Sequence, residues 1–328
     1  MRKHLGLKRN SGPIWRCCCE KCNAAESRDQ KHGKGKENIS AARNYMLERF
    51  LERVSQSDYK EHFIIKGGFL IASMVGLDTR ATMDMDITIK GQPVKEITVK
   101  EMIEEIIRVP VNDDIKFAFK NIGEIREGDE YSGYRVALSA DYPPMSVPLK
   151  LDITTEDKIT PREIEYEYRL MMEDRSIRVL AYNLSTILAE KLETVISRGD
   201  QNTRPRDYYD IYILTKLQRE NIDFETLRAA LAATSEKRGS LAVLQRYSEI
   251  MNTVCNSPIM ENQWNDYRKD FEYAAGIEFA DTCNAVVAVM NELAVPESIS
   301  ARTLKDMDRA IDNFKMGDVS GPADLSDF

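Results

Sequence analysis

The sequence predicts an α+β protein with a β-sheet in its N-terminal part and helices nearly throughout its C-terminal part. Between residues 62 and 182, short apolar runs and alternating apolar and polar residues predict strands, with two helical stretches among them. From residue 183 onward, apolar residues recur almost throughout at helical spacing. At 328 residues, 42% hydrophobic and 30% charged, the chain can bury a substantial core, and its length suggests about two domains.

We expect four segments along the chain. Residues 1–36 carry ten Lys and Arg against three Asp and Glu and lack periodicity, so they are expected to form a poorly ordered basic tail. The sheet domain is expected at residues 37–182, the helical domain at 183–316 and a loose tail at 317–328. Because the net charge is −8, the chain after residue 36 carries about −15. This balance argues against broad coating of nucleic acid but allows a local basic groove.

Several classes of protein are disfavoured by the bulk features. No apolar run approaches the roughly 20 residues that a membrane span needs, and no apolar stretch follows the basic N-terminus as it would in a signal peptide. We therefore expect a cytoplasmic protein without a membrane partner. The six cysteines do not suggest a disulfide framework. Cys17, Cys18, Cys19 and Cys22 include one C-x-x-C but no second ligand pair, which disfavours zinc.

Three elements are expected before residue 83. A helix is expected from about residue 38, with Ser40 as its N-cap. A short apolar strand at residues 63–65 follows, Gly67 and Gly68 break it, and residues 69–75 have helical apolar spacing. The next stretch, MDMDI, alternates acidic and apolar residues. On a strand, residues two apart point to the same face, so Asp84 and Asp86 are expected to project together.

The acidic pair and the glycine pair each suit the binding of a different group. Two adjacent carboxylates repel each other unless a cation offsets their charge, and Mg²⁺ prefers one or two carboxylates together with phosphates and water. A glycine pair that opens a helix supplies backbone N–H groups and the positive end of the helix dipole, both suited to phosphate. Either feature alone is more often a solvated acid pair or a simple turn. Together they predict a metal and triphosphate site.

The sheet is expected to continue after a helix at residues 98–109. Strands are predicted at 115–126, 133–142 and 147–155, followed by a hairpin within 162–182. Asp152 lies in the apolar run LKLDI, where an acid is unusual unless it is paired or binds metal. It is the candidate third carboxylate. Asp141 and Asp157 are weaker alternatives because both border loops, and a solvent-facing Asp152 on an edge strand is the structural alternative.

Two helices open the C-terminal part. The first begins at residues 183–185 with Ser185 as a possible N-cap and ends at Gly199, and it places Lys191 and Arg198 on one face, two turns apart. The second begins at Pro205, and Asp207 and Asp210 share one of its faces. These charges alone could form a surface ladder of ion pairs. Further helices are expected within 224–238, 241–255, 258–274, 281–295 and 299–314, where Trp264, Tyr267 and Phe271 fit a core better than a base-stacking platform.

The motifs together resemble a known family. Gly-Gly, a helix and Asp-x-Asp on a strand resemble the first motif of the DNA polymerase β-like nucleotidyltransferase superfamily. More narrowly, Lys66-Gly67-Gly68 and the segment Arg80-Ala81-Thr82-Met83-Asp84-Met85-Asp86 resemble the AbiEii/AbiGii toxin family. The stretch 190–214, with Lys191 and the Arg206-Asp207-x-x-Asp210 segment, resembles the downstream motifs of that family. The resemblance implies a bilobed α+β protein. It would have an N-terminal nucleotidyltransferase domain with a mixed β-sheet, a C-terminal all-helical lobe, and an active site in the cleft between them.

The resemblance also implies roles for single residues. Asp84, Asp86 and Asp152 would hold one or two Mg²⁺ ions, and Asp152 would help to deprotonate the acceptor hydroxyl. Gly67 and Gly68 would cradle the phosphates of a nucleoside triphosphate. Asp207 or Asp210 would orient Lys191 or the nucleotide. The remaining nucleotide-binding residues implied by the motifs are Lys66, Arg80, Thr82, Lys191, Arg198 and Arg206.

The implied biology is that of a toxin in a toxin–antitoxin or phage abortive-infection system. Its acceptor would be RNA, with tRNA the leading candidate, and its partner would be a cognate antitoxin protein. Two other functions are compatible with the sequence. The same scaffold could transfer a nucleotide to a small molecule such as an antibiotic, or it could bind nucleotide or RNA without turnover. The candidate third acid argues against the last of these, because a binding module has no need of three carboxylates.

Overall fold

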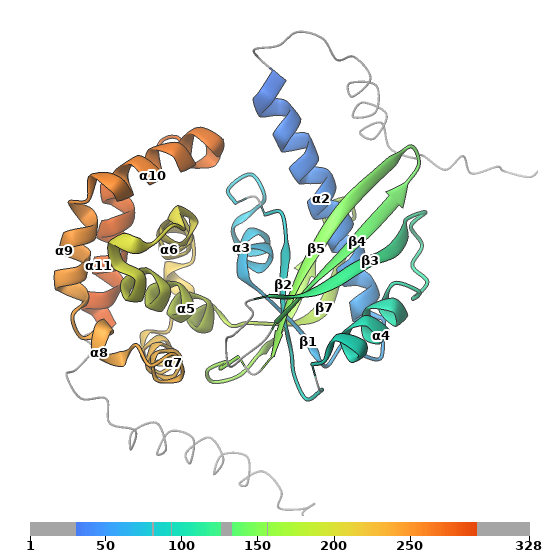
Figure 1. Cartoon of the computed structure of the whole chain (residues 1–328), viewed down its shortest axis with the longest axis horizontal. Helices are drawn as coiled ribbons and strands as arrows, with labels where there is room; N and C mark the ends of the chain where they lie inside the picture. The colour runs from blue at the N-terminus through green and yellow to red at the C-terminus, as the bar shows by residue number, and fades with distance from the viewer. Residues whose placement is uncertain (1–30, 81, 93, 126–132, 156, 294–328) are drawn as a thin grey trace, which may run out of the picture.

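The protein contains a seven-stranded mixed sheet and a set of C-terminal helices, shown by a computed structural model (Figure 1). The structure describes residues 31–80, 82–92, 94–125, 133–155 and 157–293, with side chains from residue 41 onward. The strands are β1 (Phe63–Lys66), β2 (Met85–Ile89), β3 (Lys116–Ile125), β4 (Gly133–Tyr142), β5 (Met145–Thr155), β6 (Ile164–Arg169) and β7 (Ser176–Ala181). Within the described residues, no helix is both long and apolar enough to cross a membrane.

The strand order β3-β4-β5-β2-β1-β7-β6 places the two motif strands in the middle of the sheet. Strand β2 is antiparallel to β1 but parallel to β5, and β1 is parallel to β7. The remaining neighbours, β3–β4, β4–β5 and β6–β7, pair in antiparallel fashion. The predicted mixed sheet is therefore confirmed. Because β2 lies between β5 and β1, its acidic residue Asp86 has a strand on each side.

The two faces of the central strands differ in chemistry. Alternate residues of β2 and β5 such as Ile87, Leu151 and Ile153 are fully buried. Helices α2 (Lys31–Ser55) and α4 (Glu96–Ile106) supply the other apolar side chains of this core, and α2 contacts β5 while α4 contacts β3. Because side chains alternate along a strand, the intervening residues Asp86 and Asp152 point to the opposite face. One face thus builds the core, and the other is left for polar groups.

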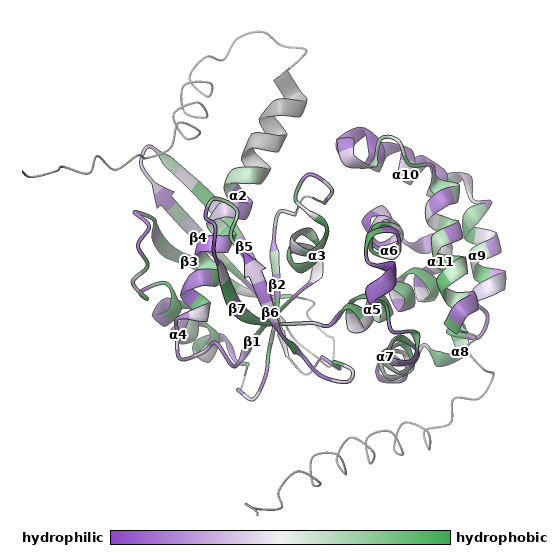
Figure 2. Cartoon of the chain, turned by 180° about the vertical axis from the view of Figure 1, so that it is seen from behind, coloured by the Kyte–Doolittle hydropathy of each residue, from purple (hydrophilic) through white to green (hydrophobic). Residues whose placement is uncertain are grey.

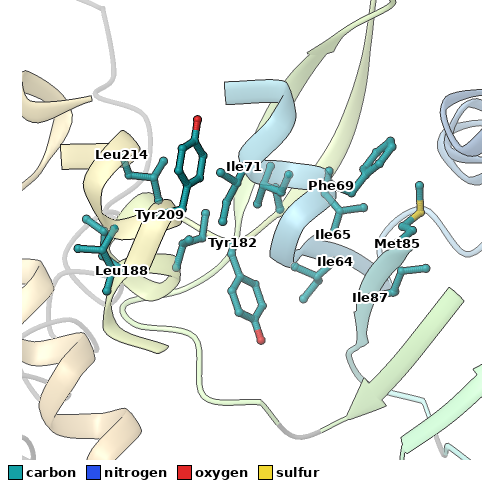
Figure 3. Close-up of a cluster of buried hydrophobic side chains, with 14 of the residues drawn as sticks. Ile64, Ile65, Phe69, Ile71, Met85, Ile87, Tyr182, Leu188, Tyr209 and Leu214 are labelled. Atoms are coloured by element: carbon teal, nitrogen blue, oxygen red, sulfur yellow. The ribbon is translucent and has the colours of Figure 1, made fainter. Parts of the chain in front are cut away.

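Helix α3 (Gly67–Val75) connects the sheet to the C-terminal helices. It contacts β1 and β2 on one side and α6 (Pro205–Leu217) on the other. Figure 3 shows Ile71 of α3 directed toward Tyr209 and Leu214, while Phe69 lies toward the sheet. All of these side chains are almost completely buried. The apolar core is therefore continuous from β1 through α3 into the helical part.

The C-terminal helices gather on one side of the sheet, with their polar residues mainly outward (Figures 1 and 2). Trp264 is fully buried and Tyr267 nearly so, with ring centroids 5.5 Å apart, and Phe271 packs on the same cluster. The predicted core role of these aromatic residues is confirmed. The helices are α5 (Leu184–Arg198), α6, α7 (Phe224–Lys237), α8 (Leu241–Leu244), α9 (Tyr247–Cys255), α10 (Pro258–Asp270) and α11 (Phe279–Leu293).

Several element boundaries differ from the prediction. Helix α2 begins at Lys31, so Ser40 lies inside it and is not its N-cap; a cap is worth only about 1 kcal/mol and does not fix a helix start by itself. Asn183, not Ser185, caps α5, because its side chain accepts a hydrogen bond from the Thr186 N–H at 2.8 Å. The predicted helix at 241–255 is two helices, α8 and α9.

Other predictions fall wholly or partly outside the described residues. These are the cysteine-containing part of the basic tail at 1–30, the helix at 299–314 and the tail at 317–328. Residues 31–36, predicted as part of the tail, belong to α2.

Candidate active site

Four adjacent strands bring four charged residues into one line across the polar face of the sheet. Lys66 pairs in register with Asp86, Asp86 with Asp152, and Asp152 with Arg135. Residues directly opposite one another on neighbouring strands point to the same face, with Cβ atoms about 5 Å apart. We call Lys66, Asp86, Asp152 and Arg135 the charged row. Two carboxylates thus lie side by side with a cation at each end.

Asp86 lies at the centre of this row and is half-buried. Burial raises the pKa of its carboxyl and outweighs the opposing effect of Lys66, Lys191 and Arg206, and Asp152 raises it further. Asp84 is also half-exposed but lies one residue before β2, which begins at Met85, two residues later than the predicted stretch MDMDI. Within the described part of the chain, neither carboxylate accepts a hydrogen bond or forms an ion pair. Both keep their oxygens available to a ligand.

The Gly-Gly pair provides space for the charged row. Gly67 has φ of +63°, and a Cβ at this position would lie 2.0 Å from Oδ2 of Asp86. A Cβ on Gly68 would lie 3.0 Å from both Nη2 of Arg80 and Oγ1 of Thr82. Close packing and the positive φ therefore require glycine at position 67, and a side chain at Gly68 would crowd Arg80 and Thr82. The predicted role in phosphate binding needs the same bare backbone, since any side chain at Gly67 would displace Asp86.

A Gly67→Ala variant is expected to lose activity on the order of 100-fold, because its methyl group must displace the Asp86 carboxylate and small displacements of reacting groups carry penalties of this size. Steady-state transfer rates would measure the loss. The matched control is Gly276→Ala, where an added Cβ meets no atom within 4 Å, and its rate should equal that of the parent protein. Equal rates for both variants would contradict the steric role of Gly67.

Arg80 and Thr82, predicted to bind nucleotide, are buried in the structure. Nε of Arg80 lies 2.6 Å from Oδ1 of Asp210, and Nη2 lies 3.4 Å from Oδ2. The side chains of Arg80 and Asp210 are 4% and 0% exposed, so this ion pair joins the segment before β2 to α6 away from water. Burial disfavours the Asp210 carboxylate, but Arg80 and Lys191 hold its pKa below the ordinary value.

Lys191 of α5 contacts both acids of the downstream motif. Its Nζ lies 2.6 Å from Oδ1 of Asp207 and 3.0 Å from Oδ2 of Asp210. The sequence left open which of the two acids belongs with Lys191, and the structure brings both to it. Burial lowers the pKa of the ammonium, but the two carboxylates outweigh it and raise this pKa. Lys191 lies on α5 and exposed Arg206 on α6, and the positive charge of each opposes the rise in the pKa of Asp86.

The structure does not bring every predicted residue to the row. Arg198 is exposed in the last turn of α5, about 10 Å along the helix from Lys191. Asp141 lies six residues from Arg135 on β4, about 20 Å away along the strand, and is excluded as the third carboxylate. Asp157 accepts hydrogen bonds from Lys66, Thr88 and Thr154. Burial opposes its ionisation, but Lys66 and the two hydroxyls hold its pKa well below the ordinary value.

Asp157 therefore has a different role from the one considered for it. It fixes the ammonium of Lys66, which also donates to Oγ1 of Thr154 at 2.7 Å. Lys66 was predicted to bind nucleotide; in the structure its Nζ is held by Thr154 of β5 and by Asp157, which follows β5. Arg135 was not singled out from the sequence. The available signal was its position as the charged, outward residue in the alternating strand GYRVALSADY.

The three predicted metal-binding carboxylates differ in whether their oxygens already accept hydrogen bonds. Arg135 holds Asp152 with two hydrogen bonds, Nε to Oδ1 at 2.7 Å and Nη2 to Oδ2 at 2.6 Å. Among the described residues, no three His, Cys, Asp or Glu side chains are grouped closely enough to hold a metal ion, so the predicted set of three carboxylates is not assembled here. Asp84 and Asp86, both with uncommitted carboxylate oxygens, fit the hard oxygen donors that Mg²⁺ prefers.

Comparison with known proteins bears directly on this site. The family described as "Nucleotidyl transferase AbiEii toxin, Type IV TA system" matches residues 49–285. Among solved structures, JHP933 from Helicobacter pylori is 14% identical, with 84% of this chain and 97% of that chain covered and a TM-score of 0.47. An antigenic nucleotidyltransferase-like protein from Paracoccidioides brasiliensis is also 14% identical, with 62% and 90% covered and a TM-score of 0.37. No protein of curated function matches the chain.

The family match spans more than two thirds of the sequence. It includes the whole charged row, the glycine pair and the cluster of Arg80, Lys191, Asp207 and Asp210. The chain therefore belongs to the AbiEii nucleotidyl transferase toxin family of type IV toxin–antitoxin systems, and it is a nucleotidyltransferase.

Proposed function

We propose that the protein is a Mg²⁺-dependent toxin that transfers a nucleotide from a nucleoside triphosphate to an RNA acceptor, with tRNA as the leading candidate. One observation carries this proposal: Asp86 and Asp152 lie in register at the centre of the charged row, and the cations Lys191 and Arg206 belong to the neighbouring helices α5 and α6. Carboxylates beside a separate set of cations suit a reaction between a polyphosphate and a hydroxyl group.

Asp84 and Asp86 would hold the metal ion. Asp152, whose two oxygens accept hydrogen bonds from Arg135, would serve the acceptor hydroxyl and would not be a third metal ligand. A bound Mg²⁺ ion would neutralise charge on the triphosphate and would stabilise the charge that develops on the reacting phosphate. The raised pKa of Asp86 is consistent with such a ligand, because burial penalises its negative charge until a cation compensates for it.

The residues of the chain itself would bind and orient the reactants. Backbone N–H groups at the start of α3, together with the positive end of its dipole, would accept a phosphate beside Gly67 and Gly68. Lys191 and Arg206 would offset the charge on the leaving pyrophosphate. Asp152 would accept the proton of the acceptor hydroxyl. At the same time the hydroxyl oxygen would bond to the α-phosphorus, and the bond from that phosphorus to the leaving pyrophosphate would break.

The biological setting follows from the family. Membership in a type IV toxin–antitoxin family implies an antitoxin partner and a nucleotide substrate. We further propose that the protein acts in the cytoplasm and that its activity restricts phage growth by abortive infection. An RNA acceptor suits such a toxin, since modification of RNA would stop translation in the infected cell.

Incubation with each of four α-³²P nucleoside triphosphates, Mg²⁺ and total RNA is expected to label an RNA band of tRNA size. Excess EDTA should prevent labelling, and Mg²⁺ added in excess of the EDTA should restore it. Without the cation, the negative carboxylates would repel the triphosphate. Labelling that persists in EDTA would contradict metal dependence. Label on small hydroxylated compounds but not on RNA would overturn the proposed acceptor.

A further inference from the structure

We propose that the acceptor strand lies across the open polar face of β3, β4 and β5, where Arg135 and Lys150 bind its backbone phosphates. This inference rests on the proposed function and adds the location and the chemistry of acceptor binding. The β4–β5 hairpin extends away from the C-terminal helices (Figure 1), and Lys191 and Arg206 belong to two of these helices, α5 and α6.

The geometry of nucleotidyl transfer constrains where the acceptor hydroxyl can lie. In phosphoryl and nucleotidyl transfer, the attacking and leaving oxygens lie roughly in line on opposite sides of the phosphorus. If Lys191 and Arg206 hold the pyrophosphate on the helical side, the acceptor hydroxyl must arrive from the other side of Asp86. In register, that side is occupied by Asp152 and then by Arg135.

The two cations on this face are placed for phosphate contact. Lys150 pairs in register with Ala137, one step along the hairpin from the Asp152–Arg135 pair, and therefore shares their face. Lys150 is exposed and, within the described residues, forms no hydrogen bond or ion pair. The Arg135 side chain is 49% exposed, and its bonds to Asp152 use Nε and Nη2. Its Nη1 group takes no part in these two bonds.

The surface around these cations is flat and open. Gly123 of β3 lies opposite Arg135, and a Cβ built there would meet no atom within 4 Å. The next position on this face of β4 is half-exposed Ala137, which has only a methyl group. An extended strand can therefore lie on the sheet without displacing bulky side chains. At the far end of the hairpin, the negative charge of Asp141 is opposite Lys116 in register, which offsets it.

The test is RNA binding measured without nucleotide, so that it is independent of turnover. The probe is a fluorescein-labelled 20-nucleotide single-stranded RNA, followed by fluorescence anisotropy at several salt concentrations. Lys150→Glu is expected to weaken binding about tenfold and to reduce the slope of log affinity against log salt by about one, because each phosphate contact releases counterions. Binding of a nucleoside triphosphate should be unchanged.

The matched control is Lys100→Glu, an exposed lysine of α4, which packs on the other face of the sheet. It should leave RNA affinity within about twofold of the parent protein. Arg135→Gln should also weaken RNA binding, whatever its effect on Asp152. Equal RNA affinity for the parent, Lys150→Glu and Arg135→Gln proteins would overturn the inference while leaving the proposed transfer intact. A parent protein that transfers nucleotide to RNA yet shows no salt-dependent binding would overturn it as well.

Discussion

Replacement of Asp86 by Asn is expected to reduce nucleotidyl transfer by roughly 1,000-fold or more. The change removes the negative charge at the centre of the charged row but keeps the size of the side chain. Loss of a single group that stabilises the transition state commonly reduces rates by 100- to 1,000-fold, and a metal ligand belongs at the upper end. Transfer of label to RNA under saturating nucleotide would measure the effect.

The same substitution is expected to leave the fold intact or slightly stabilised. Burial raises the pKa of Asp86, so ionisation of this carboxyl costs more free energy in the folded than in the unfolded protein, and a neutral amide avoids this cost. Urea unfolding would show a midpoint equal to or above that of the parent protein. Asp141→Asn, at the far end of the hairpin, is the matched control and should keep full activity. An active Asp86→Asn protein would contradict the assignment of the site.

Replacement of Arg80 by Ala is expected to destabilise the protein by about 3 kcal/mol or more. Asp210 is completely buried, and removal of one partner from a buried ion pair leaves an uncompensated charge, which typically costs 3–5 kcal/mol. Lys191 still contacts Asp210, so the lower end of this range applies. Denaturant unfolding followed by circular dichroism would measure the change in free energy.

The Arg80 effect should depend on pH in a defined direction. The folded-state pKa of Asp210 lies below its ordinary value of 3.8, so the ion pair contributes stability above about pH 4 and loses it as the pH falls through the folded pKa. The difference between the Arg80→Ala and parent proteins should therefore shrink in acid. Lys269→Ala, which removes an exposed pair with Asp266, is the control and should change stability by less than about 1 kcal/mol. A similarly small change for Arg80→Ala would exclude the pair as a structural link.

Local pattern was sufficient to predict much of the fold. Strand β4 has the predicted bounds, because its alternation places Val136 and Leu138 in the core and Pro143-Pro144 follow its last residue. Gly199 closes α5 with φ of +52°, and Pro205 opens α6, as their backbone preferences require. The caps of α2 and α5 were less predictable, since Ser40 and Ser185 compete with neighbouring residues and a cap contributes little free energy.

The partners of the site residues could not be read from the sequence, because they depend on strand order. The neighbouring positions of Asp86 and Asp152 require β2 to pair with β5, which is separated from it in sequence by β3 and β4. The same pairing brings Thr88 and Thr154 together around Asp157 and so explains why Lys66 is held there. The Arg80–Asp210 pair joins residues 130 positions apart, so no local pattern indicates it.

The central claim is that these carboxylates support transfer of a nucleotide, and the stoichiometry of the reaction tests it most directly. Label incorporated into RNA from an α-³²P nucleoside triphosphate and pyrophosphate released should be counted in the same reaction. The account predicts one pyrophosphate for each nucleotide added, with both products lost in the Asp86→Asn protein. Release of inorganic phosphate without label on the acceptor, or nucleotide binding without any release, would contradict it.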